Sequence, residues 1–162
     1  CLFVCLFVCG SVCGPVGVEH RIKIPDARMT ASTYYSSRYY PYYGRLNEIR
    51  EDGAWCTKTK NNRTDYLQVD MITVHSVCAV ATQEHGRSSD WITSYKVHFS
   101  TDGGTWNSYK ENNVEKVFPG NTDRSSIVKH SLSPVVKARF VRFYPVTYEA
   151  WPCLRIDIFV LK

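Results

Sequence analysis

The sequence predicts an all-β domain, and three observations support this class. Aromatic residues make up 14% of the 162 residues, a share that favours strands. Short segments with alternating apolar and polar residues recur along the chain from residue 66, with turn residues between them. No segment has the apolar period of an amphipathic helix. One antiparallel β sandwich or barrel is therefore expected.

The first regular segments begin at residue 66. In residues 66–71, Leu67, Val69 and Met71 alternate with polar residues and share one face of a strand. Residues 74–83 are rich in β-branched and small side chains, which predicts a second strand buried on both faces.

Residues 94–110 give the clearest local signal, a β-hairpin. Tyr95, Val97 and Phe99 alternate along the first strand. The turn residues Asp102-Gly103-Gly104 tolerate positive φ, and Trp106 is expected to begin the return strand.

Three more strands are expected towards the end of the chain. Residues 126–134 alternate and are expected to stop at Pro134. Residues 138–145 place Phe140 with Arg142 on one face, and Arg139, Val141 and Phe143 on the other. Residues 153–162 put Leu154, Ile156, Ile158 and Val160 on a shared face.

The first ten residues form an uncharged apolar run that is too short to cross a membrane. We interpret residues 1–11 as the remnant of a secretory signal peptide and residues 12–162 as a single domain. The alternative is a buried first strand.

Four cysteines remain beyond that remnant: Cys13, Cys56, Cys78 and Cys153. Export predicts an extracellular or secreted protein in which disulfides persist, and Asn62-Arg63-Thr64 is a glycosylation acceptor triplet. The formal charge of +5 is spread along the chain, so nucleic acid is not an expected partner.

The residues also argue against catalysis. The five histidines stand apart from one another, without the spacing of a zinc site. The chain lacks a nucleophile elbow, a phosphate-binding glycine loop and a calcium loop. We therefore expect a binding protein that is not an enzyme and uses no metal or cofactor.

Eight motifs then resemble the discoidin family, the type C domains of coagulation factors five and eight. In chain order they are IPDARMTAS, GAWC, YLQVDM, VATQ, SYKVHFSTDGGTW, GNTD, ARFVRFYP and CLRIDIF. The motif sequences are especially similar to those of the collagen-binding discoidin domain receptors and the lactadherin-like proteins. The resemblance implies an eight-stranded, distorted antiparallel jelly-roll barrel of the galactose-binding-like type. Its chain ends would meet at one pole, and ligand-binding spike loops would project from the other.

The resemblance also implies how the cysteines behave. It pairs Cys56 with Cys153. In the family, the first cysteine, which Cys13 resembles, pairs with a cysteine just after the last strand. This sequence ends there, at Lys162. Cys13 is therefore expected to be unpaired or to pair with a cysteine beyond that point. A Cys13–Cys153 bridge is not expected, because a strand of about 25 Å separates them. Cys78 lies in an apolar segment, and for that reason it is expected to be a buried free thiol rather than a bridge or a nucleophile.

Aromatic and charged residues within the matching motifs are expected to build the scaffold: Trp55, Tyr66, Asp70, Trp106, Phe140, Arg142, Tyr144 and Arg155. The ligand site is expected on three spikes, at residues 34–38, 45–52 and 84–91, completed by Trp151. Its expected ligand-contacting residues are Tyr34, Tyr35, Arg38, Tyr39, Arg45, His85, Arg87, Asp90, Trp91 and Trp151.

For three neighbouring tyrosines, packing beneath the first loop explains their presence at least as well as ligand contact does. These are Tyr40, Tyr42 and Tyr43. Tyr35 falls where the receptors carry an exposed tryptophan, and Asp90 where they carry an acidic collagen contact. The favoured ligand is a matrix or cell-surface protein, collagen-like in character. The alternatives are an anionic phospholipid surface and a glycan.

Overall fold

The computed structural model describes residues 10–84 and 86–162, so the expected signal remnant lies almost wholly outside the described residues. The strands are β1 (Cys13–Pro15), β2 (Met29–Ala31), β3 (Trp55–Cys56), β4 (Leu67–Gln83), β5 (Trp91–Ser100), β6 (Asn107–Ser108), β7 (Lys110–Glu111), β8 (Val114–Glu115), β9 (Phe118–Pro119), β10 (Ile127–Glu149) and β11 (Cys153–Leu161). The described residues also contain three short 3-10 helices: η1 (Asp26–Arg28), η2 (Ser37–Tyr39) and η3 (Pro41–Tyr43). None of them has the length and apolar character needed to cross a membrane.

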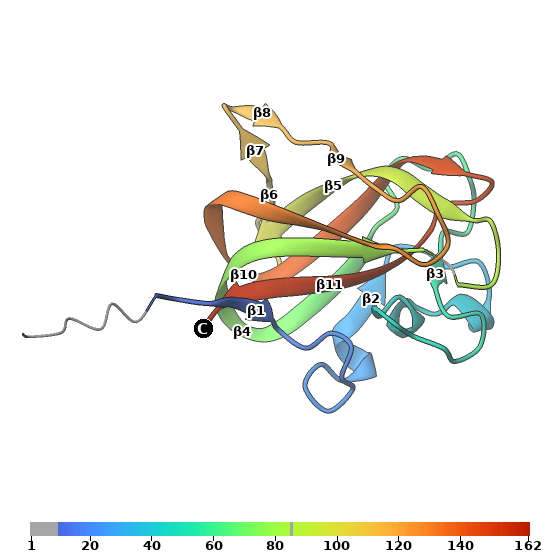
Figure 1. Cartoon of the computed structure of the whole chain (residues 1–162), viewed down its shortest axis with the longest axis horizontal. Coiled ribbons are helices and arrows are strands. Elements are labelled where there is room, and N and C mark those ends of the chain that lie inside the picture. Colours follow the sequence, from blue (N-terminus) through green and yellow to red (C-terminus); the bar gives the residue numbers. More distant parts are fainter. Residues whose placement is uncertain (1–9, 85) are drawn as a thin grey trace, which may run out of the picture.

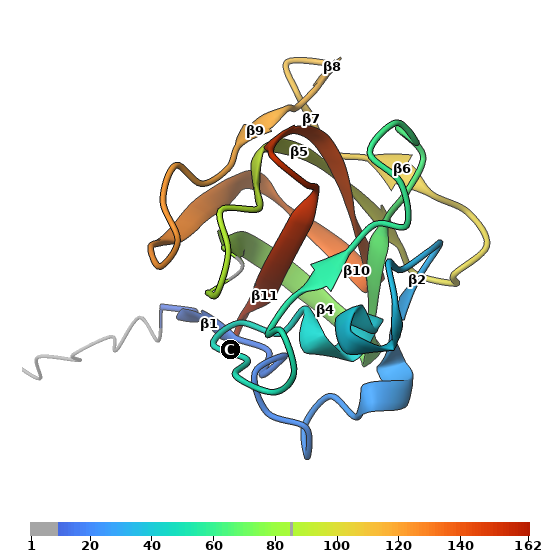
Figure 2. The ribbon, with the colours of Figure 1, turned by 90° about the vertical axis from the view of Figure 1, so that its right-hand side faces the viewer.

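Nine of these strands form an antiparallel sheet that wraps around one main core, and β7 and β8 form a separate two-stranded sheet (Figures 1 and 2). The order is β1-β11-β4-β10-β5-β6, with β2 on β4, β3 on β11 and β9 on β5. Val69, Val97, Val141 and Ile158 come from four of these strands, and each is at most 1% exposed. The all-β prediction is therefore confirmed.

Residues 67–83 form one strand, β4, where the sequence predicted two. Leu67, Val69 and Met71 are buried, as predicted. The break at residues 72–74 is an irregularity within the strand, because Ile72 has a φ of 73° and its amide donates to Asp70 Oδ1 at 2.8 Å. Positive φ is unusual for a β-branched residue, and here it marks a shift in pairing with β10.

Strand β10 likewise joins two predicted strands, so the expected stop at Pro134 is wrong. Pairing with β4 shifts between Ser131 and Val136. Pro134 lies inside this irregular stretch, where its missing N–H removes no ladder hydrogen bond.

The face predicted for Arg139 is also wrong. Val141 and Phe143 are buried, but Arg139 lies at a second register shift, between Ala138 and Phe140. Its guanidinium donates twice to the Asp70 carboxylate, at 2.8 Å each. The shift keeps this charge out of the apolar core and pairs it.

The predicted hairpin is confirmed in β5 and β6. Gly103 has a φ of 79°, and Asp102 Oδ1 accepts from the amides of Gly104 and Thr105, both at 2.8 Å. Trp106 directly precedes the return strand, which begins at Asn107.

The Cys56–Cys153 disulfide is confirmed, and it links β3 to β11. The expectations for the other two cysteines are wrong, because Cys13 and Cys78 form a second disulfide. Cys78 is the extra residue of β4 where the pairing with β11 shifts between Phe159 and Val160. Such a bulge changes where a side chain points, and the Cα atoms of the two cysteines lie 6.0 Å apart.

The two disulfides mark opposite ends of β11. Leu161 pairs with Cys13 at one end, where the amide of Lys162 also donates to the carbonyl of Val12 at 2.9 Å. Cys153 pairs with Cys56 at the other end. Figure 1 shows β1 and the C-terminus on the left and β3 on the right. The site described next lies at the β3 end.

Candidate functional site

The first spike is an aromatic segment anchored to β3. The amide of Tyr35 donates to the carbonyl of Cys56 at 3.0 Å, and Trp55 Nε1 donates to the carbonyl of Thr33 at 2.8 Å. Trp55 is fully buried, as expected of a scaffold residue. The outer residues Tyr34 and Tyr35 remain 43% and 55% exposed.

The later tyrosines pack into a ladder beside this loop. The Tyr34 ring is 4.8 Å from that of Tyr40, Tyr40 is 5.5 Å from Tyr42, and Tyr42 is 4.6 Å from Tyr43. The Arg50 guanidinium lies 5.3 Å from the Tyr43 ring. Tyr40, Tyr42 and Tyr43 are only partly exposed, which agrees with the packing interpretation.

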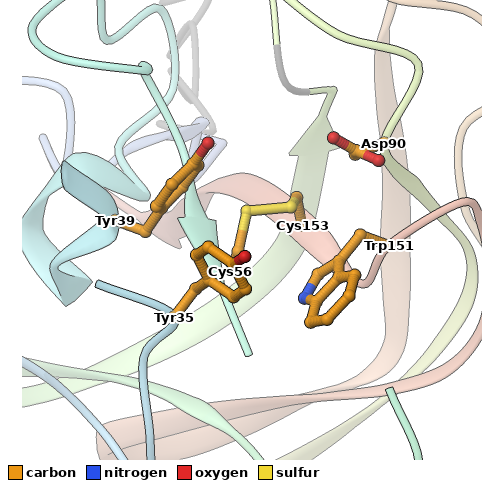
Figure 3. A pocket seen from close by; sticks show the side chains of 6 residues that line it. All are labelled: Tyr35, Tyr39, Cys56, Asp90, Trp151 and Cys153. Atoms are coloured by element: carbon orange, nitrogen blue, oxygen red, sulfur yellow. A yellow bond between two sulfur atoms is a disulfide. The ribbon is translucent and has the colours of Figure 1, made fainter. Parts of the chain in front are cut away.

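Four of the predicted site residues meet in one pocket of about 180 Å³ (Figure 3). The Tyr35 ring lies edge-on to Tyr39 at 5.6 Å and to Trp151 at 5.1 Å. Asp90 adds a carboxylate. The Cys56–Cys153 disulfide also lines the pocket, and ties the strands beneath it. We call this the rim pocket.

Hydrogen bonds hold the walls of the rim pocket in place. Trp151 Nε1 donates to the carbonyl of Thr57 at 2.9 Å. Asp90 accepts from the Ser88 hydroxyl at 2.5 Å. The ammonium of Lys60 lies 5.0 Å from the Trp151 ring, so this aromatic wall already attracts a cation.

Tyr39 is a pocket wall that stays neutral. Burial, followed by a hydrogen bond to Asp52, raises the pKa of its phenol to about 12. Asp52 also accepts from Arg38 at 2.7 Å, and Glu51 lies 3.8 Å from the same guanidinium. The charge of Arg38 is therefore largely compensated.

Arg45 does not face a ligand, which corrects the expectation for the second spike. Its side chain is 1% exposed, and it donates to the carbonyl of Val18 at 2.5 Å and to Asp26 at 2.9 Å. Such a paired, buried arginine belongs to the scaffold.

The second spike instead exposes an apolar residue that the sequence did not single out. Ile49 is 78% exposed. Arg87, from the third spike, donates to the carbonyl of Ile49 at 3.2 Å and so joins the two loops. An isolated isoleucine in a charged loop gives little signal in the sequence, because single exposed apolar residues are common.

The remaining predicted residues lie around or outside the pocket. Trp91 opens β5 and pairs with Glu149. The Tyr34 ring packs against Tyr40 and does not line the rim pocket. His85 lies outside the described residues. Across the ranges 10–84 and 86–162, no group of three or more His, Cys, Asp or Glu side chains is placed to hold a metal ion.

Comparisons with known proteins agree with this architecture. The F5/8 type C domain family matches residues 28–158. The EGF-like repeat and discoidin I-like domain-containing protein 3 of Mus musculus is 36% identical over 153 residues, covering 89% of this chain and 32% of that protein. Lactadherin of Mus musculus is 35% identical over 153 residues, with the same two coverages. The chain thus spans about a third of the length of these curated relatives.

Among solved structures, discoidin II of Dictyostelium discoideum superposes on this chain with a TM-score of 0.78. The sequence identity is 26%, and the match covers 94% of this chain and 60% of that one. The expected jelly-roll architecture is therefore confirmed.

Proposed function

The chain belongs to the F5/8 type C (discoidin) domain family, and from that premise we propose that it is an extracellular adhesion module for a matrix or cell-surface protein, collagen-like in character. Domains of this family are binding modules. The rim pocket, with Tyr35, Tyr39, Trp151 and Asp90, is the observation that carries the proposal.

The chemistry of the rim pocket favours a basic side chain of the partner. Aromatic ring faces attract a cation, and a carboxylate beside them forms a charge-assisted hydrogen bond with it. A volume of about 180 Å³ is below the roughly 300–1,000 Å³ typical of small-molecule sites. The partner would therefore insert the end of a lysine or arginine, with Asp90 as its counter-charge.

The surrounding rim supplies broader contacts. Tyr34 and Trp91 offer ring surface, and Arg38 and Arg87 offer hydrogen-bond donors at the edge. His85 stays a proposed contact of the third spike. Arg45 leaves the proposed site because it is buried.

An anionic phospholipid surface is the second candidate, and Ile49 is the observation that favours it. An isoleucine that is 78% exposed at a loop tip is suited to shallow insertion into a bilayer. Charge argues the other way, because Arg38, Arg45 and Arg50 are each paired with carboxylates. Lipid attraction through arginines depends on charge that is not already compensated.

The disulfides support an extracellular location. Cys13–Cys78 and Cys56–Cys153 persist in oxidising compartments and are rare in reducing ones. A secreted or cell-surface location fits an adhesion module.

A binding panel tests the proposal. Wild-type protein, Tyr35→Ala and Arg38→Ala are measured on immobilised collagen, phosphatidylserine vesicles and a glycan array. We expect the wild type to bind the protein of the panel, immobilised collagen. Its affinity for collagen should fall by about tenfold or more in Tyr35→Ala and by less in Arg38→Ala.

Two outcomes oppose the proposal. Binding to vesicles alone, weakening steeply with salt, would support the lipid candidate instead. Affinities unchanged in both variants, with the fold intact, would remove the first spike from the site.

A further inference from the structure

A second cavity, which we call the strand cavity, shares no lining residue with the rim pocket. Its volume is about 540 Å³, within the range of sites that hold small ligands. It is lined by Arg63, Thr64, Lys96, His98, Glu115, Tyr144, Pro145 and Val146. Two of these residues belong to the acceptor triplet Asn62-Arg63-Thr64.

The acceptor asparagine is exposed in the loop between β3 and β4. Its side-chain oxygen accepts from the amide of Thr64 at 3.0 Å and from the Thr64 hydroxyl at 2.7 Å. These two bonds fix the amide plane of Asn62. The nitrogen Nδ2, which N-glycosylation modifies, therefore has a defined orientation.

The middle residue of the triplet fastens the loop to the cavity. Arg63 donates a hydrogen bond to the carbonyl of Val146, which lies in β10 and lines the cavity. Thr64, which holds the Asn62 amide, lines the same cavity. A sugar on Asn62 therefore starts at the edge of the strand cavity.

The walls of the strand cavity match a sugar ring. Tyr144 presents an aromatic ring, tilted against that of His98 with 4.5 Å between their centres, and Pro145 and Val146 add apolar surface. Glu115 is hydrogen-bonded to His98 at 3.0 Å and paired with Lys96. Sugars combine apolar ring faces with hydroxyl groups, so this wall offers both kinds of contact.

We propose that Asn62 carries an N-linked glycan whose first N-acetylglucosamine packs into the strand cavity. The co-reactant is a lipid-pyrophosphate-linked oligosaccharide, transferred by an enzyme of the secretory pathway. A bond forms between Asn62 Nδ2 and C1 of the first sugar, and the bond from C1 to the pyrophosphate oxygen breaks. Nδ2 loses one proton, and the lipid pyrophosphate leaves with the bonding electron pair.

The modification is tested first, on protein secreted from a glycosylating eukaryotic cell line. Mass spectrometry of the peptide containing Asn62 is expected to show the glycan in wild type and Thr64→Ser. It is expected to be absent in Asn62→Gln and Thr64→Ala. An unmodified Asn62 in the secreted wild type would overturn the proposal.

The packing is tested by trimming the glycan to its first sugar and comparing melting temperatures. We expect the trimmed form to melt about 3 °C or more above Asn62→Gln, because the remaining sugar keeps its contact with the Tyr144 ring. In the Tyr144→Leu background this difference should fall below about 1 °C. Equal differences in both backgrounds would overturn the packing, whatever Tyr144→Leu itself costs in stability.

A second measurement keeps the test independent of stability. In the trimmed protein, NMR cross-relaxation is expected between the acetyl methyl group of the sugar and the Tyr144 ring. Its absence, with the sugar signals as sharp as those of a free glycan, would also overturn the packing.

Discussion

Neighbouring tyrosines in the first spike serve different surfaces. Tyr35 packs 5.1 Å from Trp151 in the rim pocket, whereas Tyr34 packs 4.8 Å from Tyr40 in the ladder. A step of one residue thus separates a tyrosine of the rim pocket from a tyrosine of the ladder. The two tyrosines therefore need separate tests.

Glu84 is a residue whose charge costs stability. It is 1% exposed, and burial, followed by the charge of Asp123, raises the pKa of its carboxyl to about 9. In the unfolded chain the carboxyl ionises near its ordinary value of 4.5. The fold is therefore destabilised progressively as the pH rises from about 4.5 towards 9.

Glu84→Gln removes this cost while keeping the shape of the neutral acid. We expect the variant to match wild type near pH 4 and to exceed its free energy of unfolding by at least about 1 kcal/mol at pH 8. Urea titrations from pH 4 to 9 measure this, with Glu149→Gln at an exposed position as the control. Parallel curves for Glu84→Gln and wild type would contradict it.

At the scale of elements, Asp70 connects three segments. From β4 it accepts from Arg139 of β10 and from Arg28 of η1, the latter at 2.7 Å. The hydrogen bond from Arg139 is the main cause that lowers the pKa of Asp70 to about 2, against the opposing effect of burial. The stability from this lowered pKa is present above about pH 4 and is lost as the pH falls through 2.

Asp70→Asn is expected to lower the free energy of unfolding by about 2 kcal/mol at pH 6, since it leaves the two arginines without their carboxylate. The deficit relative to wild type should shrink between pH 4 and pH 2. Denaturant titrations at three pH values measure it, with Glu149→Gln as a control on the same sheet. A deficit that does not change with pH would argue against the ion pairs.

Alternation predicted the strand faces well, and bulges explain where it failed. Leu154, Ile156, Ile158 and Val160 are all buried, as their spacing predicted. The period-two rule assumes unbroken pairing, so it misses the shifts that move Arg139 and Cys78. Cys78 was expected to be a buried free thiol because it lies in an apolar segment, and that segment gives no sign of the bulge.

The candidate site was predictable in part. The motif order placed Tyr35, Asp90 and Trp151 on loops of one pole, and the structure brings them together with Tyr39. The burial of Arg45 was not predictable, because its partner Asp26 lies in the distant helix η1 and only the fold joins them.

At the scale of the whole molecule, the second disulfide and the proposed site lie at opposite poles. The Cys13–Cys78 bridge joins β1 to β4 near the meeting chain ends, and the rim pocket lies at the other end of β11. Removing that bridge is therefore expected to affect stability rather than binding.

The double variant Cys13→Ala/Cys78→Ala tests this separation. The sequence separation of 65 residues gives an expected loss of up to about 4 kcal/mol in the free energy of unfolding. Ligand affinity measured below the melting temperature should stay within about twofold of wild type. A large loss of affinity in the folded variant would show that the poles are coupled.

The central claim is that the rim pocket binds a basic side chain. It is tested most directly by NMR of the Trp151 indole N–H during titration with N-acetyl-arginine amide and with its neutral isostere, N-acetyl-citrulline amide. We predict saturable shifts with arginine, and affinity weaker by about tenfold or more for citrulline and for Asp90→Asn. Tyr35→Phe should keep most of the response, and Tyr35→Ala should lose it. Equal responses to arginine and citrulline, or no response at Trp151 in the folded protein, would contradict the account.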